Sequence, residues 1–275
     1  MTTPRPKLAL IAGGGDIPAL IRDACIAEGR PLYIAALNGF CPASTVTGVD
    51  HDWFDLPQVG RLLKALKQAG AAEVCLCGSV SKPDFATLKP DWRGALLLPK
   101  LLKAALQGDD AILRVVLDTF EQDGFRIVGI DSLMQGLLVA ERQYGQLAPV
   151  GAAVSNLQLA IGAAHALGAA DRGQAAVAAG GSVVGLEDAA GTDALLARMA
   201  TLPAARGGVL AKCVKPQQDR RVDLPTIGVT TVENAAAAGL AGIAVEAGAA
   251  LLVDPVATAA AADRLGLFVV GFRNG

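Results

Sequence analysis

Apolar and polar positions along the first half of the chain follow a strand–helix–strand order. Three short apolar runs have the length and composition of buried strands: 7–12, 31–37 and 73–80. Between them, apolar residues three or four apart predict amphipathic helices at 17–29 and 56–70. Two further helices at 95–108 and 109–124 and a strand at 125–130 complete this half. A repeated β-α-β order predicts a parallel sheet with right-handed crossovers.

The second half shows the same two periodicities in a less familiar order. Helices are predicted at 155–168, 231–242 and 257–266, and strands at 207–214 and 267–272, with a hairpin around Gly180 and Gly181. We therefore expect an α/β protein with two domains. The first, at 1–148, is a Rossmann-like parallel-sheet domain with its linker, and the second, at 149–275, is an α/β domain of less common topology.

The amino-acid composition disfavours some classes of function and indicates where the protein acts. The 275-residue chain has a net charge of -2 and 4% aromatic residues, which disfavours a nucleic-acid surface. Its five cysteines, an odd number in an apolar chain, indicate reduced core residues. The N-terminus lacks the apolar stretch of a signal peptide, and polar residues interrupt the longest uncharged run. These features predict a soluble, cytoplasmic protein.

The segment Lys212–Asn234 concentrates charge in an otherwise apolar chain. Lys212, Lys215, Arg220 and Arg221 surround Asp219 and Asp223, and Gln218 lies among them. Four cations suit an anionic ligand, and two carboxylates suit a metal ion or a general base. The alternative is a surface loop whose acids and bases pair with one another. Spacing alone leaves both interpretations open.

Two glycine-containing turns are further candidates for phosphate binding. Gly14, Gly15 and Asp16 join the first predicted strand to its helix, and Gly78, Ser79 and Lys82 follow the third strand. Both turns lie at the carboxyl edge of the predicted sheet, where ligands of such folds bind. Gly191, Thr192 and Asp193 begin another helix, and Asp193 is either its cap or a site residue.

Metal-binding patterns are sparse. The chain has two histidines, His51 and His165, without paired spacing, so zinc is disfavoured and both histidines are expected outside the site. Cys75 and Cys77 share one face of a predicted strand but have no nearby partner. Any metal is expected to have oxygen ligands, as Mg²⁺ or Mn²⁺ does.

Three segments resemble the UDP-2,3-diacylglucosamine pyrophosphatases of the LpxI family. Lys212–Gly228 matches K-x-x-K-P-x-Q-D-x-R-x-D-x-P-T-I-G, Asp171–Gln174 matches D-x-G-Q, and Asp188–Asp193, preceded by the acidic Glu187, matches a segment ending in G-T-D. The resemblance covers nearly the whole chain, and the matched segments lie in order along it. Ser79 and Lys82 depart from the family's G-K-V-x-R-P pattern.

The resemblance implies metal-assisted hydrolysis of UDP-2,3-diacylglucosamine to UMP and 2,3-diacylglucosamine 1-phosphate (lipid X), a step toward lipid A. Asp223 would hold Mg²⁺ or Mn²⁺ or deprotonate the attacking water, with Asp219 supporting it. Lys215 would act in catalysis, and substrate would be bound by Lys212, Gln218, Arg220, Arg221 and the two glycine turns, together with Gly191, Thr192 and Asp193. The expected partners are this UDP-linked lipid, the inner face of the inner membrane through peripheral contact, and a second copy in a homodimer, with no nucleic acid.

Two other function classes stay open. A non-catalytic nucleotide-sugar or lipid-binding protein would need similar groups. A nucleotide-dependent oxidoreductase would use the first glycine turn, but the second predicted strand ends in ALNGFCP, without the acidic residue that binds the ribose of NAD.

Overall fold

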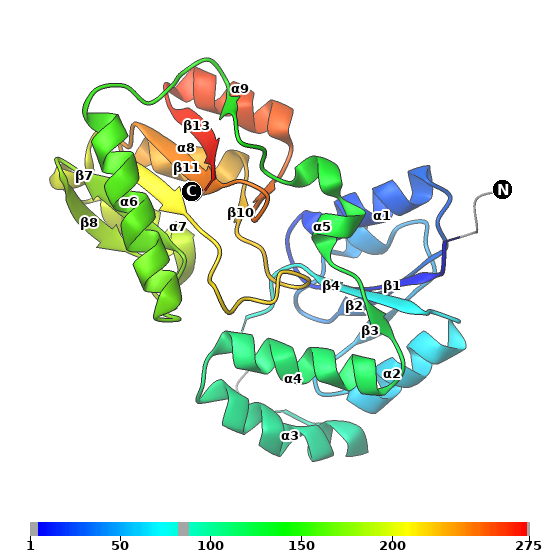
Figure 1. Cartoon of the computed structure of the whole chain (residues 1–275). Coiled ribbons are helices and arrows are strands. Elements are labelled where there is room, and N and C mark those ends of the chain that lie inside the picture. Colours follow the sequence, from blue (N-terminus) through cyan, green and yellow to red (C-terminus); the bar gives the residue numbers. More distant parts are fainter. Residues whose placement is uncertain (1–4, 82–87, 274–275) are drawn as a thin grey trace. The chain divides into compact units, whose positions relative to one another are not determined.

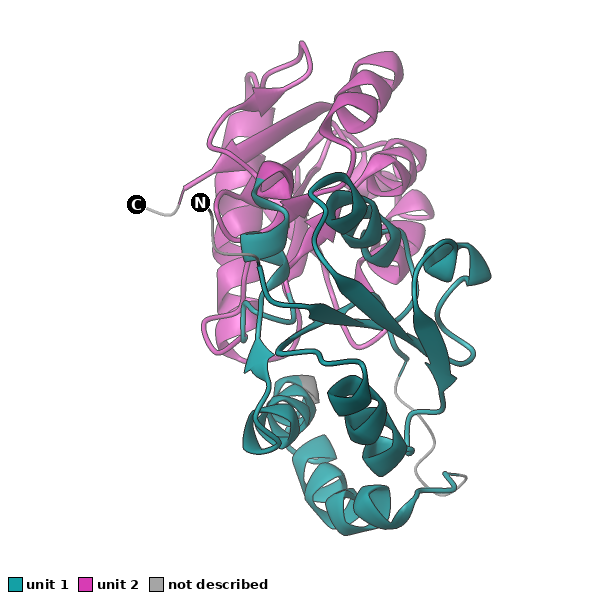
Figure 2. Cartoon of the chain, turned by 90° about the vertical axis from the view of Figure 1, so that its right-hand side faces the viewer, with its two compact units in different colours: residues 1–135, 219–223 teal, residues 136–218, 224–275 magenta. Residues whose placement is uncertain are grey.

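The computed structural model describes residues 5–81 and 88–273 and divides the chain into two compact units (Figure 2). Unit 1 comprises residues 1–135 and 219–223, and unit 2 comprises residues 136–218 and 224–275. The predicted fold class is confirmed: unit 1 contains a parallel five-stranded sheet and unit 2 a mixed six-stranded sheet. Each unit has its own hydrophobic core.

Unit 1 is built on a sheet with the strand order β3-β2-β1-β4-β5, in which every pair is parallel (Figure 1). This is the order of a Rossmann-like half-sheet. The strands are β1 (Leu8–Ala12), β2 (Leu32–Leu37), β3 (His51–Phe54), β4 (Glu73–Cys77) and β5 (Arg126–Ile127). The helices are α1 (Ile17–Ala27), α2 (Val59–Gln68), α3 (Trp92–Ala105), α4 (Asp109–Gln122) and α5 (Ile130–Leu133). Strand β3, at the edge of the sheet, was not predicted.

The strands at the centre of unit 1 are buried on both faces, as continuous apolar runs predict. Every residue of β1 and β2 is buried. On one face, Ala9 and Ile11 of β1 share a core with Leu63 of α2 and with Leu117 and Phe120 of α4. Helices that cover a parallel sheet exclude water from both sides, so alternation of polar residues is lost in these strands.

Unit 2 contains a mixed sheet with the order β6-β13-β11-β9-β7-β8. Its strands are β6 (Gln143–Tyr144), β7 (Ala175–Ala179), β8 (Ser182–Leu186), β9 (Val209–Lys212), β11 (Gly242–Glu246) and β13 (Phe268–Phe272). A separate parallel pair is formed by β10 (Thr226–Ile227) and β12 (Leu251–Leu252). The helices are α6 (Ala152–Ala169), α7 (Gly191–Ala200), α8 (Val229–Ala237) and α9 (Pro255–Leu265). Strands β9, β11 and β13 are parallel to one another, so their carboxyl ends share one edge.

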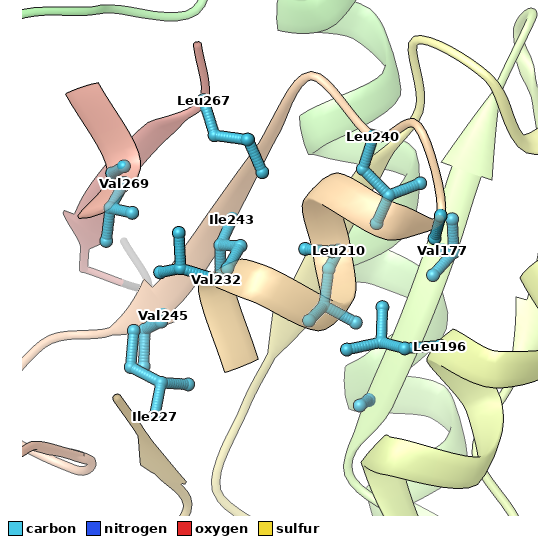
Figure 3. Packing of buried hydrophobic residues seen from close by; sticks show 14 of the residues in the cluster. Val177, Leu196, Leu210, Ile227, Val232, Leu240, Ile243, Val245, Leu267 and Val269 are labelled. Atoms are coloured by element: carbon cyan, nitrogen blue, oxygen red, sulfur yellow. The ribbon is translucent and has the colours of Figure 1, made fainter. Parts of the chain in front are cut away.

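The two faces of the unit 2 sheet differ in side-chain size around β7 and the end of β9. One face carries large residues, including Leu210, Ile243 and Val269, which pack with Leu196 of α7 and Val232 of α8 (Figure 3). The other face carries small residues at β7 and at the end of β9, which pack with α6: Ala176, Ala178, Ala211 and Cys213. Farther along this face, Val209 and Phe268 are larger. Small side chains allow α6 to approach the strands closely, and the period of two in each strand separates the two sets.

Residues 136–148, which the sequence places with the first domain as a linker, are grouped with unit 2. The reason is visible in β6, because Gln143 and Tyr144 pair with Val270 and Val269 of β13. The boundary at residue 148 itself stays a prediction. Among the helices of the described residues, none combines the length and apolar composition that crossing a bilayer requires.

A buried ion pair lies at the amino ends of the unit 1 strands. Glu73 begins β4 and is 3% exposed, and it pairs with Arg30, which is 8% exposed, and with the exposed Arg126. Burial lowers the pKa of Arg30, because desolvation penalises the charged guanidinium. The carboxylate of Glu73 therefore compensates a charge that has little access to water.

We predict that Glu73→Gln destabilises unit 1 by about 3 to 5 kcal/mol, because it leaves the buried charge of Arg30 without its carboxylate. Urea unfolding followed by circular dichroism measures the change. Glu28→Gln is the matched control, since the Arg5–Glu28 pair is solvent-exposed and should contribute less than about 1 kcal/mol. Equal losses in the two variants would contradict the assignment.

Candidate functional site

The two glycine turns of unit 1 lie side by side, as predicted. Gly14 and Ser79 form an antiparallel bridge, in which the N–H of Gly14 donates to the carbonyl of Ser79 (2.8 Å) and the N–H of Ser79 donates back (2.9 Å). Gly78 has φ +89°, and a Cβ there would lie 2.6 Å from the Gly14 carbonyl oxygen. Glycine at position 78 is thus explained by backbone packing, and the binding roles of Gly14, Gly78 and Ser79 stay predictions.

The turn continues through Gly15 and Asp16 into α1. Gly15 has φ +85°, a conformation that favours glycine. Asp16 occupies the N-cap position, and within the described chain its side chain makes no capping hydrogen bond. Pro18 lies in the first turn of the helix, where proline is favoured. Lys82, the remaining candidate of this edge, lies outside the described residues.

The charged segment predicted as one loop is divided between the two units. Lys212 and Lys215 belong with Gln218 to unit 2, whereas residues 219–223 belong to unit 1. Within unit 1, Val222 packs against the core formed by β1, α2 and α4. The Arg221 backbone lies against Gly129, where a Cβ would approach the Arg221 Cα to 3.0 Å. Gly129 follows β5, so this segment reaches the carboxyl edge of the unit 1 sheet.

Arg221 and Asp219 form an ion pair. The guanidinium of Arg221 donates to both carboxylate oxygens of Asp219, with Nη2–Oδ2 at 2.7 Å and Nε–Oδ1 at 2.9 Å. It also donates from Nη1 to Glu121 of α4 at 2.7 Å. The hydrogen bonds from Arg221 hold the pKa of Asp219 below its ordinary value, and those from Asp219 and Glu121 raise the pKa of Arg221. The sequence left open a loop whose acids and bases pair with one another, and Arg221 and Asp219 do pair in this way.

Asp223 ends the short passage through unit 1. Its N–H donates to the carbonyl of Asp219 at 3.1 Å, which closes a turn over residues 219–223. The residue is half-buried, and the next residue, Leu224, is buried in unit 2. Arg220, within the same turn, is exposed. The turn holds the backbone of Asp223 between the partly buried Val222 and the buried Leu224, so its carboxylate is attached to ordered structure.

In unit 2, the predicted residues of the charged segment lie at the carboxyl end of β9. Lys212 is 8% exposed, and its Nζ donates to the carbonyl of Thr226 in β10 at 2.9 Å. The ammonium of Lys215 pairs with Asp171 (2.9 Å), a residue with φ +52°. The backbone N–H of Lys215 donates to Oε1 of the buried Gln218 at 3.1 Å. These contacts fix both ammonium groups in position.

Glu187 joins two of the segments that carry the family resemblance. Its carboxylate accepts a hydrogen bond from the N–H of Gln174 (2.6 Å) and another from the hydroxyl of Thr192. Glu187 is 7% exposed, so the charge is desolvated and fixed by these donors. Sequence reasoning noted its acidity but missed this linking role. The acidic residue that precedes the G-T-D segment is the sequence signal that could have indicated this role.

Asp193 does not cap α7, whose N-cap is Ala190, so the cap interpretation of this residue is wrong. It lies in the first helical turn and accepts a hydrogen bond from Nδ2 of Asn234 in α8 at 3.1 Å. Gly191 begins the helix with φ +83°. The substrate-binding roles of Gly191, Thr192 and Asp193 stay predictions.

A second group of potential ligands lies between α6 and the sheet of unit 2. One potential ligand atom from each of His165, Cys213 and Glu246 lies within 4.8 Å of the other two. Burial raises the pKa of the Cys213 thiol to about 12. Sequence reasoning placed His165 outside any site and expected only oxygen ligands. The three residues are far apart in sequence, so only the pairing of β9 with β11 and the packing of α6 bring them together.

Unit 1 also contains a cavity of ≈ 340 Å³ among α2, α3 and α4. None of the predicted site residues lines it, so it is distinct from the charged segment. Its walls combine apolar and charged side chains: Val59, Leu63, Trp92, Arg93, Leu96, Leu97, Lys100, Val115, Asp118, Thr119, Gln122 and Asp123.

Comparison with known proteins covers both units. Residues 7–137 match the family model of the LpxI N-terminal domain, and residues 140–270 match that of the LpxI C-terminal domain. The chain is 45% identical over 272 residues to the UDP-2,3-diacylglucosamine pyrophosphatase LpxI of Caulobacter vibrioides, covering 96% of this chain and 97% of that protein. These two matched ranges include the candidate segments at the carboxyl edges of both sheets. The chain therefore belongs to the LpxI family.

Proposed function

We propose that this protein hydrolyses the diphosphate of UDP-2,3-diacylglucosamine to UMP and 2,3-diacylglucosamine 1-phosphate, in lipid A biosynthesis. The observation that carries the proposal is the 45% identity, over 96% of the chain, to a pyrophosphatase named for this substrate. The reaction adds water across one P–O bond of the anhydride and releases two phosphate monoesters. It needs a base for the water and cations for the charge that develops on the departing phosphate.

In the proposed mechanism, Asp223 accepts the proton of the attacking water or holds the divalent ion beside it. Lys215, with Lys212, neutralises the diphosphate and the charge on the departing group. Asp171 holds the ammonium of Lys215 in place (2.9 Å), which supports a fixed rather than a mobile cation. A charge positioned before the substrate arrives stabilises the transition state without reorganisation. Gln218, Arg220 and Arg221 complete the proposed substrate contacts.

The donor chemistry of Asp223 and Asp219 fits Mg²⁺ or Mn²⁺, which prefer carboxylate oxygens. Both oxygens of Asp219 accept hydrogen bonds from Arg221, so a cation there would compete with the guanidinium. In this proposal Asp223 is the principal ligand, and Asp219 positions Arg221. Bound at this place, the ion would polarise a phosphoryl oxygen or lower the pKa of the attacking water.

Helix α3 presents an apolar face to solvent, and we propose that this face contacts the membrane that contains the substrate. Trp92 and Leu96 of α3 and Leu106 at its C-cap are 69%, 68% and 90% exposed, and they recur at helical spacing on one side. Lys100 and Lys103 are exposed beside them. Exposed apolar residues, a tryptophan and flanking lysines are typical of helices that lie on anionic lipid surfaces.

The same proposal places the protein in the cytoplasm, at the inner face of the inner membrane. A non-catalytic role in binding the nucleotide-linked lipid is the second candidate function, favoured by the mutual pairing of Arg221 and Asp219. Release of UMP distinguishes the two functions. The expected homodimer stays a prediction.

The first test is Asp223→Asn. We expect the rate of UMP release to fall by at least about 10²- to 10³-fold, because the amide neither accepts the proton nor ligates a hard cation well. Substrate binding, measured by calorimetry, should persist. Glu233→Gln, which removes an acid of α8 paired only loosely with Arg264 (3.7 Å), should keep wild-type turnover. Wild-type turnover of Asp223→Asn would remove this residue from the mechanism.

The second test is chelation. Treatment with EDTA followed by buffer exchange should abolish UMP release, and Mg²⁺ or Mn²⁺ should restore it, since a carboxylate site prefers hard cations. A coupled assay for UMP, with each ion added alone, reports the result. Full activity in the presence of chelator, or restoration by Zn²⁺ but not by Mg²⁺, would contradict an oxygen-ligated cofactor.

The third test is flotation with vesicles of phosphatidylglycerol and phosphatidylethanolamine. Leu96→Glu should lower the floated fraction several-fold, because it places a like charge on the face that meets anionic lipid. Val256→Glu is the matched control, since Val256 on α9 is 81% exposed but lies outside α3. Equal flotation of the two variants would exclude α3 as the contact, and a wild-type protein that stays in the soluble fraction would exclude membrane contact altogether.

A further inference from the structure

Strand register brings three ligand-type side chains together in unit 2. Lys212 pairs with Val245 across β9 and β11, so the next residues, Cys213 and Glu246, follow side by side at the carboxyl edge. Alternation places both on the face that carries Ala211 and Ala244, which is the face covered by α6. His165 projects from α6 into this layer. The convergence thus follows from the period of the strands and the packing of one helix.

The histidine of this cluster has an unused binding atom. Nε2 of His165 is buried and, within the described residues, has no hydrogen-bond partner. A buried imidazole nitrogen without a partner is costly, and it needs a donor, a water or a cation. Cys213 is 1% exposed, and one carboxylate oxygen of Glu246, Oε2, accepts the N–H of Val214 at 3.0 Å. That hydrogen bond orients the Glu246 carboxylate and, among the described residues, leaves its other oxygen for a ligand.

We propose that His165, Cys213 and Glu246 bind one thiophilic divalent cation of the Zn²⁺ class. A thiolate, an imidazole and a carboxylate form the mixed S, N, O set that such ions take, with a fourth position left for water. Ligand atoms around a tetrahedral ion lie about 3.5 Å apart, given metal–ligand distances of about 2.0 to 2.3 Å. The ligand atoms of the cluster lie within 4.8 Å of one another, so side-chain rotations on metal binding would have to bring them closer together. On binding, Cys213 releases its proton to solvent and His165 binds through the lone pair of its neutral ring.

This ion would differ in kind from the proposed catalytic cofactor. Mg²⁺ prefers oxygen ligands, and a set with a thiolate selects against it. The inference therefore does not rest on the proposed hydrolysis. The inference is tested by the metal content and the absorption spectrum of the protein, and not by UMP release. Either proposal can therefore fail while the other one stands.

The position of the cluster indicates what the ion would do. It would connect α6, β9 and β11 at the start of the segment 213–218. That segment is already tied to the end of α6, because Gln217 Nε2 donates to the carbonyl of Gly168 (3.0 Å) and Lys215 pairs with Asp171. Fixing Cys213 would hold Lys215, two residues later, in a defined place. The ion would thus have a positioning role, without contact to substrate.

The experiment is a titration of the metal-free, reduced full-length protein with Co²⁺, which replaces Zn²⁺ and reports its ligands by absorption. We expect one equivalent to bind, with thiolate-to-cobalt charge transfer in the near ultraviolet and the intense visible bands of tetrahedral cobalt. Zn²⁺ should displace it, and Mg²⁺ in large excess should not. Cys213→Ser should abolish the charge-transfer band, and His165→Gln and Glu246→Gln should weaken binding at least about tenfold.

The control is Cys77→Ser, because Cys77 is a buried cysteine at the end of a parallel strand in unit 1 and has Cys75 as a neighbour. It should bind cobalt as wild type does. Glu246→Gln retains an acceptor for the Val214 N–H, so it separates loss of a ligand from loss of fold, and circular dichroism checks all variants. Absence of a charge-transfer band in the wild type, or a band that survives Cys213→Ser but disappears in Cys77→Ser, would overturn the proposal.

Discussion

The parallel pairing of β9 with β11 is the constraint on which the geometry of unit 2 depends. It sets Lys212 opposite Val245 and so decides which side chains leave the sheet on each face. Lys212 reaches β10 on one face, and Cys213 lies against α6 on the other. A slip of one residue would exchange the two, because the side-chain period of a strand is two. The apolar packing of both faces holds the register and therefore holds these candidate site residues.

Pairing among the charged residues and binding of an anion are compatible. Lys215 is held by Asp171, and Arg221 by Asp219 and Glu121, so each cation has a fixed position before any ligand arrives. Asp171 adopts φ +52°, a conformation that costs a non-glycine residue about 1 to 3 kcal/mol and persists only where its surroundings impose it. Such strain next to a lysine at a sheet edge is typical of functional sites.

The sequence predicted the parallel sheet of unit 1 because its central strands are long, apolar and separated by amphipathic helices. It did not predict β3, since His51 and Asp52 are polar and exposed at a sheet edge. The two-residue strands β6, β10 and β12 are too short to show any periodicity. Short strands depend on their neighbours for pairing, and that information lies in tertiary contacts.

For the candidate site, too, the sequence does not show which residues come together. Adjacency in sequence suggested one loop, but residues 219–223 belong to unit 1 and the preceding lysines to unit 2. Conversely, His165 showed no partner in sequence, because Cys213 and Glu246 become its neighbours only through helix packing and strand register. Motif spacing finds ligands that share one element, as in a zinc finger. It does not find ligands that three elements contribute.

The two groups of potential metal ligands differ in a way that allows both to operate in one chain. Carboxylates of the 219–223 segment offer hard oxygen atoms near the surface, whereas the cluster under α6 adds a buried thiol and an imidazole. Zn²⁺ binds nitrogen and sulfur far better than Mg²⁺ does, while Mg²⁺ is much more abundant in cells and suffices for oxygen ligands. Ligand type would therefore separate the proposed positioning ion from the proposed catalytic one, without any need for the protein to distinguish them by size.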